Sequence, residues 1–330
     1  MGAVSVTFAC GRYDRVQPLT DGRVAVEGCD LNVVHLEPEE CFWRMLRHEE
    51  FDAAEMSLAS YAMLLGRGDD RFVGIPVFLS RSFRHSAIWV TEDGPVSSPA
   101  DLDGARVGVP EYQMTASVWV RGLMQHDLGV DVPSVTWRTG GLDQPGRVER
   151  QPLQVPGWVK VEPVPADRTL VQELLDGHLD ALTAPRVPAE FRRPGTRLRR
   201  LLPDWKERER RWFEETGIFP IMHMVVVRRD VAERLPWLPG ALTKGLKAAK
   251  DVALAGLLDA PALRYTMPFL LAALEEQAAV FGPDPWPYGL AANRRTLEVF
   301  LGHLVEQGLL AEPFTPESLF APSSLDEARI

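Results

Sequence analysis

Two histidines are the residues of this chain best suited to move a proton near neutral pH. His85 and His223 each stand close to the start of an apolar, strand-like run, and an imidazole titrates near physiological pH. Two glutamates, Glu55 and Glu111, could accept a proton from a hydroxyl group or join the histidines at a divalent metal ion. From the residues alone, a structural role is the commoner one for each histidine, and a helix-capping or hinge role is at least as common for each glutamate. Because no close-spaced ligand motif occurs, we favour proton transfer over a bound metal.

Three arginines could hold an acidic ligand. Arg12, Arg84 and Arg186 follow or flank predicted strand ends, and the planar guanidinium matches a carboxylate through two parallel hydrogen bonds. A surface ion pair is the alternative, and it is the commoner role of an arginine. The formal net charge of −10 implies no broad basic face and argues against nucleic acid as a partner. An anionic ligand must therefore be recruited by a local arginine cluster.

The fold must position these side chains, and residues 107–117 indicate which fold class this is. Val107 and Val109 predict a short buried strand, and a polar turn and a helix over about 115–128 follow it. In an α/β sheet such a turn lies at the carboxyl edge of the strands, where ligands bind. The first N–H groups of the helix also favour an anion. Glu111, Tyr112 and Gln113 therefore stand where chemistry would be done.

Strand-like and helical segments alternate along the chain, as in α/β proteins with parallel sheets. Two such series precede helical segments at about 240–258, 261–281 and 293–308, while the proline-rich stretch 144–165 predicts an extended loop or an excursion along a sheet edge. We therefore expect an α/β, two-lobed fold of the type II periplasmic-binding-protein class with C-terminal helices. Residues 1–92 plus 221–330 would form the first, discontinuous lobe and residues 93–220 the second. A ligand cleft would lie between the lobes, which could close on it by hinge motion.

Other residues near predicted strand ends and breaks have two interpretations. Thr139 and Gly140 could present backbone N–H groups to an anion, or form only a turn. Trp286 and Tyr288 could stack on an aromatic ligand, or pack to order a proline-rich break.

Composition and termini predict a soluble, cytoplasmic protein. The three cysteines lack metal-ligand spacing, which favours free thiols in a reducing compartment. The first residues do not have the pattern of a secretory signal, and no apolar run approaches the length of a membrane span. We expect no membrane partner, and the sequence leaves homo-oligomerisation open.

Eight stretches, in their running order, resemble the 4,5-dihydroxyphthalate decarboxylase family, and together they span nearly the whole chain. The stretches are 10–15, 42–46, 51–57, 83–88, 108–115, 137–141, 217–223 and 286–289. The resemblance implies a binding-protein-like fold that acts as an aromatic-acid decarboxylase without an organic cofactor. Met224 departs from the family pattern, which usually has a hydroxyl residue there, so the substrate could differ.

The resemblance implies decarboxylation of 4,5-dihydroxyphthalate, or a close analogue, to protocatechuate by ring protonation. Such a route needs a general acid over the ring, an acceptor at the hydroxyl and a clamp for the carboxylates. We expect His85, His223 and Glu111 to be catalytic. A small-acid binding protein, or an enzyme of the same fold acting on another carboxylated substrate, are the alternatives. The residues expected to bind the small anionic aromatic substrate are Arg12, Tyr13, Glu55, Ser57, Arg84, Tyr112, Gln113, Thr139, Gly140, Arg186, Trp286 and Tyr288.

Overall fold

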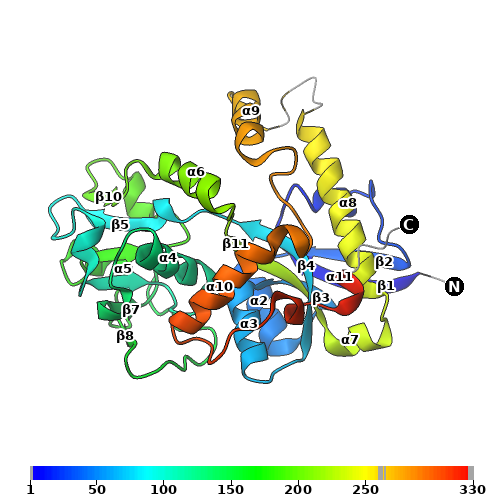
Figure 1. The fold of residues 1–330 in the computed structure, drawn as a ribbon, viewed down its shortest axis with the longest axis horizontal. Helices are drawn as coiled ribbons and strands as arrows, with labels where there is room; N and C mark the ends of the chain where they lie inside the picture. Colours follow the sequence, from blue (N-terminus) through cyan, green and yellow to red (C-terminus); the bar gives the residue numbers. More distant parts are fainter. Residues whose placement is uncertain (1–2, 259–262, 264, 326–330) are drawn as a thin grey trace.

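The computed structural model describes residues 3–258, 263 and 265–325 and contains two β-sheets, one in each half of the view in Figure 1. The first sheet has five strands in the order β2-β1-β3-β11-β4. Its strands are β1 (Val4–Cys10), β2 (Cys29–His35), β3 (Ala53–Ser57), β4 (Phe72–Arg81) and β11 (Ile221–Arg228). β1 runs parallel to β2 and β3, whereas β11 runs antiparallel to both of its neighbours.

The second sheet has six strands in the order β10-β5-β9-β6-β7-β8. Its strands are β5 (Ile88–Thr91), β6 (Arg106–Val109), β7 (Thr136–Thr139), β8 (Lys160–Pro163), β9 (Ala181–Thr183) and β10 (Leu198–Arg200). The centre of this sheet is parallel, while β5 pairs antiparallel with β9 and β10. Residues 88–91 thus belong to the second sheet, so the expected lobe boundary at residue 92 lies too late. A short apolar strand after a crossing can join either sheet, and its sequence does not say which.

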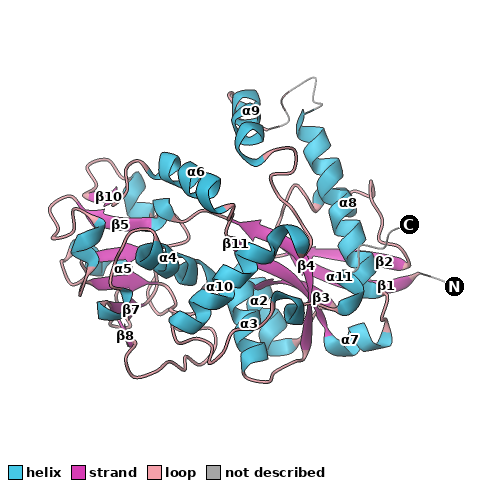
Figure 2. Cartoon of the chain, in the orientation of Figure 1, coloured by secondary structure: helices cyan, strands magenta, loops and turns pink. Residues whose placement is uncertain are grey.

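Helices cover both sheets, as Figure 2 shows. The helices in the chain segments that also form the first sheet, or that follow β11, are α1 (Gln17–Thr20), α2 (Pro38–His48), α3 (Leu58–Gly66), α7 (Arg229–Arg234), α8 (Leu238–Leu258), α9 (Leu270–Phe281), α10 (Arg294–Glu306) and α11 (Pro322–Leu325). Those of the second are α4 (Thr115–His126), α5 (Leu170–Leu175) and α6 (Trp205–Thr216). The helix expected at 261–281 begins only at Leu270, and residues 259–262 and 264 lie outside the described residues. The stretch 144–165, expected as an extended loop or an edge excursion, contains the edge strand β8, because extended backbone at a sheet edge tolerates proline.

One apolar core runs through both halves of the molecule. It contains Phe42 and Met56 from the first half, Val107 and Trp119 from the second, and the inner face of α10. Trp119 on α4 lies 5.2 Å, between ring centroids, from Phe300 on α10. The helix near the end of the chain therefore ties the two halves together through buried side chains, which are the main source of packing stability.

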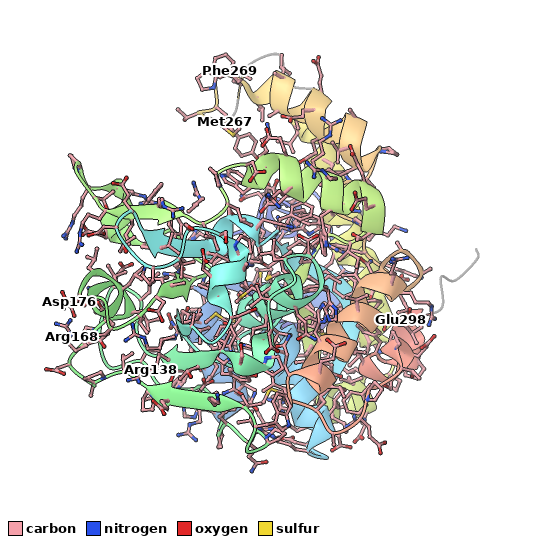
Figure 3. The ribbon with its side chains drawn as sticks, turned by 60° about the vertical axis from the view of Figure 1, so that its left-hand side comes forward. Arg138, Arg168, Asp176, Met267, Phe269 and Glu298 are labelled. Carbon is pink, nitrogen blue, oxygen red and sulfur yellow. The ribbon has the colours of Figure 1, made fainter. Side chains whose placement is uncertain are left out.

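The outer end of α8 and the helix α9 project from this body, while the first turns of α8 pack against the first sheet. Figure 3 shows Met267 and Phe269 at the outer end of this projection, and the two side chains are 50% and 81% exposed. The base of α9 is held by Phe281, whose ring lies 4.5 Å from that of Phe213 on α6. No helix within the described ranges is long and apolar enough to cross a membrane.

Candidate active site

Glu55 is the centre of a polar cluster at one edge of the first sheet. Its side chain is fully buried and accepts hydrogen bonds from the Gly11 backbone N–H (2.8 Å), the Tyr13 hydroxyl (2.6 Å) and Nδ1 of His223 (2.6 Å). β1 and β3 end at this edge and the antiparallel β11 begins there. The topology thereby brings together residues that are 168 positions apart in the chain.

The cluster keeps Glu55 ionised. Burial by itself raises the pKa of this carboxyl, but the hydrogen bond and charge of His223, with the bonds from Tyr13 and Gly11, outweigh burial and lower it. Burial, and then the charge of Glu55, raise the pKa of the Tyr13 hydroxyl. Tyr13 therefore remains a donor to an ionised carboxylate, which can only accept.

His223 is oriented by this carboxylate. Because Nδ1 donates to Glu55, the opposite nitrogen, Nε2, is left for a ligand. The imidazole meets the edge of the Phe42 ring at a centroid distance of 4.8 Å, which limits its rotation. A carboxylate that fixes an imidazole and stabilises its protonated form is a common arrangement for moving protons.

A loop of the second half reaches the same aromatic ring. The Arg150 guanidinium lies 5.3 Å from the centroid of Phe42, so a guanidinium and an imidazole contact one ring. Arg150 also binds Glu111, through its backbone N–H (3.1 Å) and its Nη2 (3.3 Å). A guanidinium that can bind a carboxylate and an imidazole that can transfer a proton therefore lie around the Phe42 ring. Such a site suits the binding of an aromatic acid.

Arg147 joins the two halves of the molecule at this site. Its Nη2 lies 2.5 Å from Glu111, and its Nη1 lies 3.2 Å from Glu39 on α2. Both oxygens of Glu111 are occupied by arginine donors, which does not suit the expected role of Glu111 as a free proton acceptor. Arg147 and Arg150 were not among the expected site residues, because they lie in the proline-rich stretch 144–165. No local sequence pattern marks them, because they meet Glu111 across 36 and 39 positions of the chain.

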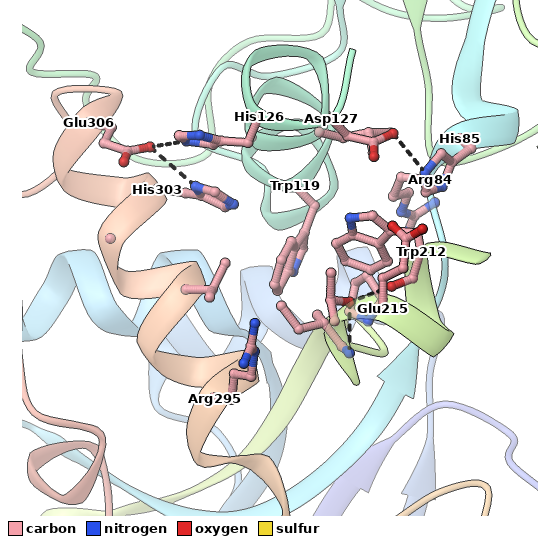
Figure 4. A pocket seen from close by; sticks show the side chains of 17 residues that line it. Arg84, His85, Trp119, His126, Asp127, Trp212, Glu215, Arg295, His303 and Glu306 are labelled. Carbon is pink, nitrogen blue, oxygen red and sulfur yellow. Dashed lines mark hydrogen bonds and ion pairs between the residues drawn. The ribbon is translucent and has the colours of Figure 1, made fainter. Parts of the chain in front are cut away.

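His85 lies at a different place. It is buried, its Nε2 is 3.5 Å from Asp127, and its ring is 5.7 Å from that of Trp212. It lines a cavity of about 510 Å³ that Figure 4 shows, and His223 and Glu55 do not line this cavity. The structure therefore does not bring the two expected catalytic histidines together.

Arg84 lines the same cavity and donates to the Pro185 carbonyl at 3.3 Å. Burial lowers its pKa to about 10, and the charge of Glu209 opposes that shift.

Arg12 and Arg186 lie at the rim of the cluster. Arg12 is exposed and lines a groove of about 420 Å³ together with Tyr13 and Glu37. Arg186 approaches Glu37 to 3.9 Å, and both side chains are exposed. The two arginines thus flank one acidic residue at the opening beside Tyr13.

Three further expected residues point into packed regions. The Ser57 hydroxyl lies 2.8 Å from that of Thr115, which joins the starts of α3 and α4. The Tyr112 hydroxyl donates to the Gln307 carbonyl at 3.1 Å, and Gln113 donates to the Gln151 carbonyl at 2.6 Å.

The remaining expected residues also have packing roles. Gly140 lets β7 approach its neighbour, because an added Cβ would lie 2.4 Å from Val164, and Thr139 ends β7. Trp286 donates its indole N–H to the Phe78 carbonyl, and burial raises the pKa of Tyr288. Arg15, which was not among the expected site residues, lies between the rings of Tyr13 and Trp286, 4.3 Å from each.

Solved structures share this fold. The periplasmic aliphatic sulphonate binding protein SsuA of Escherichia coli aligns with a TM-score of 0.53 and 13% identity, covering 97% of this chain and 98% of that one. A Candida albicans protein with the generic periplasmic-binding-protein fold aligns with a TM-score of 0.51 and 11% identity over 99% and 98% of the two chains. These alignments confirm the expected type II periplasmic-binding-protein fold, and at such identities they show the fold alone.

Sequence relatives are more specific. No protein-family model matches the chain. The 4,5-dihydroxyphthalate decarboxylase of Pseudomonas putida is 42% identical over 191 residues, which is 58% of this chain and 74% of the relative. The enzyme of the same name from Comamonas testosteroni is 39% identical over 330 residues, the full length of both proteins. This chain therefore belongs to the 4,5-dihydroxyphthalate decarboxylase family.

Proposed function

We propose that this protein is a carboxy-lyase that converts 4,5-dihydroxyphthalate, or a close analogue, to protocatechuate and CO2. The observation that carries the proposal is the full-length identity of 39% to an enzyme of that name. The pair of Glu55 and His223 supports it, because it places an oriented imidazole at the edge of the sheet where ligands of this fold class bind.

The reaction needs a proton before CO2 leaves. Direct loss of CO2 would leave a carbanion in the plane of the ring, which the aromatic π-system cannot stabilise. Protonation of the ring carbon that carries the carboxylate avoids this, and a hydroxyl group para to that carbon supplies electron density. The carbon–carbon bond then breaks, its electron pair restores the aromatic ring, and CO2 departs. One carboxylate is replaced by one hydrogen, so each turnover consumes one proton.

His223 is our candidate for the proton donor. Its Nε2 would protonate the ring carbon and would then be reprotonated from water. Glu55 would stabilise the imidazolium and hold its orientation through Nδ1, while Tyr13 and Gly11 keep the carboxylate in place.

Arg150 is our candidate for the residue that binds a substrate carboxylate, with Arg12 at the rim of the site. Arg150 contacts the same Phe42 ring as His223, so a ligand held by it would lie near Nε2. Glu111 would then act as a positioning residue that holds Arg147 and Arg150.

The first experiment is to measure CO2 release from 4,5-dihydroxyphthalate by the purified protein in D2O, with and without a chelator. We expect protocatechuate that carries one deuterium, at the ring position that lost the carboxylate. Phthalate, which lacks both hydroxyl groups, is the matched control and should not be turned over. Saturable binding of 4,5-dihydroxyphthalate without CO2 release would overturn the proposal and favour a small-acid binding protein.

A further inference from the structure

A second cluster of histidine and glutamate lies between α4 and α10, away from Glu55. His126 is the last residue of α4, and His303 and Glu306 lie on α10. Residues three apart on a helix share one face, so both α10 side chains can reach His126. Figure 4 shows the three side chains together at one end of the cavity that also contains His85.

The distances within this cluster suit a metal ion. Oε2 of Glu306 lies 2.8 Å from Nε2 of His126 and 3.3 Å from Nδ1 of His303. One ligand atom from each residue lies within 4.8 Å of the other two, and this is the group of three such residues found in the described part of the chain. Around a tetrahedral zinc ion with bonds of about 2.0–2.2 Å, ligand atoms are roughly 3.3 Å apart. Small rotations of the half-exposed His126 and Glu306 side chains would reach that spacing.

Packing against α4 fixes the position of the His303 imidazole. Its side chain is 10% exposed, and its ring lies so close to α4 that a Cβ on Gly122 would be 2.4 Å from Nε2. The edge of Trp119 supports it at a centroid distance of 5.7 Å. The rings of His126 and His303 lie nearly parallel, tilted by 18° with centroids 5.2 Å apart. One rigid imidazole and two adjustable ligands allow a site to close around an ion without moving the backbone.

We propose that His126, His303 and Glu306 bind a divalent transition-metal ion of the zinc class. Two histidines and one carboxylate leave a fourth position open to water or a ligand. The ion would connect α4 of the second half to α10, and so would join the two halves of the molecule at a place separate from the Glu55 cluster. This inference does not depend on the decarboxylase proposal, since the cavity and the Glu55 cluster have no lining residue in common.

Calorimetric titration of chelator-stripped protein with Zn2+ tests the site, and the visible spectrum with Co2+ reports its coordination. We expect one equivalent bound per chain and a melting temperature that rises with zinc concentration. His303→Ala, His126→Gln and Glu306→Gln should each weaken binding about tenfold or more, because even the loss of a residue that only supports a metal ligand weakens binding by that factor.

His178→Ala is the matched control, because His178 lies 3.4 Å from Glu173 in a histidine–glutamate pair that has no second histidine among the described neighbours. It should keep the wild-type affinity, as should His223→Ala, which tests for zinc at the Glu55 cluster. Absence of a saturable equivalent, or an affinity that all three variants retain, would overturn the proposal. Melting curves recorded without metal show whether each variant folds.

Discussion

Two of the places where a histidine lies beside a glutamate differ in their surroundings. Glu55 is fully buried and takes donors from a backbone N–H, a phenol and one imidazole. Glu306 is 43% exposed and lies between two imidazoles. A carboxylate with three protein donors fixes one imidazole and leaves its far nitrogen for a substrate. A carboxylate open to solvent keeps lone pairs for an ion. Burial, rather than residue type, therefore separates a site suited to proton transfer from one suited to metal binding.

Replacing His223 should have the largest effect. His223→Ala should lower kcat for CO2 release by about 10² to 10⁴, the usual range for a general acid, with an unchanged circular dichroism spectrum. His85→Ala is the comparison, because His85 faces the other cavity, and it should cost far less. An equal loss in the two variants would show that the proton does not come from the Glu55 cluster alone.

Glu55→Gln should have the next largest effect. A neutral amide stabilises the imidazolium less, and we expect kcat to fall about 10²-fold. Stability should respond as well, since the pKa of Glu55 is lower in the folded protein than its ordinary value. That stabilisation is fully present above the unfolded pKa of about 4.3 and is lost as the pH falls through the folded pKa.

Urea unfolding at a series of pH values measures the stability effect. The free energy of unfolding of the wild type should fall more steeply below about pH 4 than that of Glu55→Gln. Glu312→Gln, at an exposed position, should keep the wild-type slope. Parallel curves for the wild type and Glu55→Gln would refute the lowered pKa.

Arg150→Lys tests the proposed carboxylate clamp. A lysine keeps the charge but loses the planar fork, so we expect KM to rise about tenfold, the loss of roughly 1.4 kcal/mol, with a smaller change in kcat. Arg147→Lys should change KM less, because the Arg147 guanidinium is already shared between Glu111 and Glu39. A larger rise in KM for Arg147→Lys than for Arg150→Lys would indicate that Arg147, beside α2, binds the substrate carboxylate.

Tyr13→Phe should have the smallest effect of the four. It removes one of three donors to Glu55, and a hydrogen bond to a charged group contributes about 1.5–3 kcal/mol. We expect a lower melting temperature and a kcat reduced about tenfold or less. Tyr265→Phe, at an exposed position, is the control. A loss as large as that of His223→Ala would show that Tyr13 takes part in the proton transfer.

The positions of helices and strands could be predicted from the sequence better than the contacts between residues far apart in the chain. Helix α4 begins at Thr115, as the strand–turn–helix pattern after Val107 predicts, because hydrophobic period and turn chemistry are local properties. Glu55 and His223 were both candidates, but their contact depends on β11 pairing antiparallel with β3. His85 also precedes a strand, yet its short 3₁₀ turn carries it to the other cavity.

The sequence by itself determined the α/β class, the succession of strands and helices, and the family, through motifs that keep their order along the chain. Only the tertiary structure decided that Glu55 meets His223, that a proline-rich loop brings Arg147 and Arg150 to Glu111, and that α10 brings His303 and Glu306 to His126. The physical reason is the sequence separation over which each kind of interaction acts. Periodicity and capping act over a few residues, whereas strand pairing and helix packing join positions whose separation leaves no periodic trace.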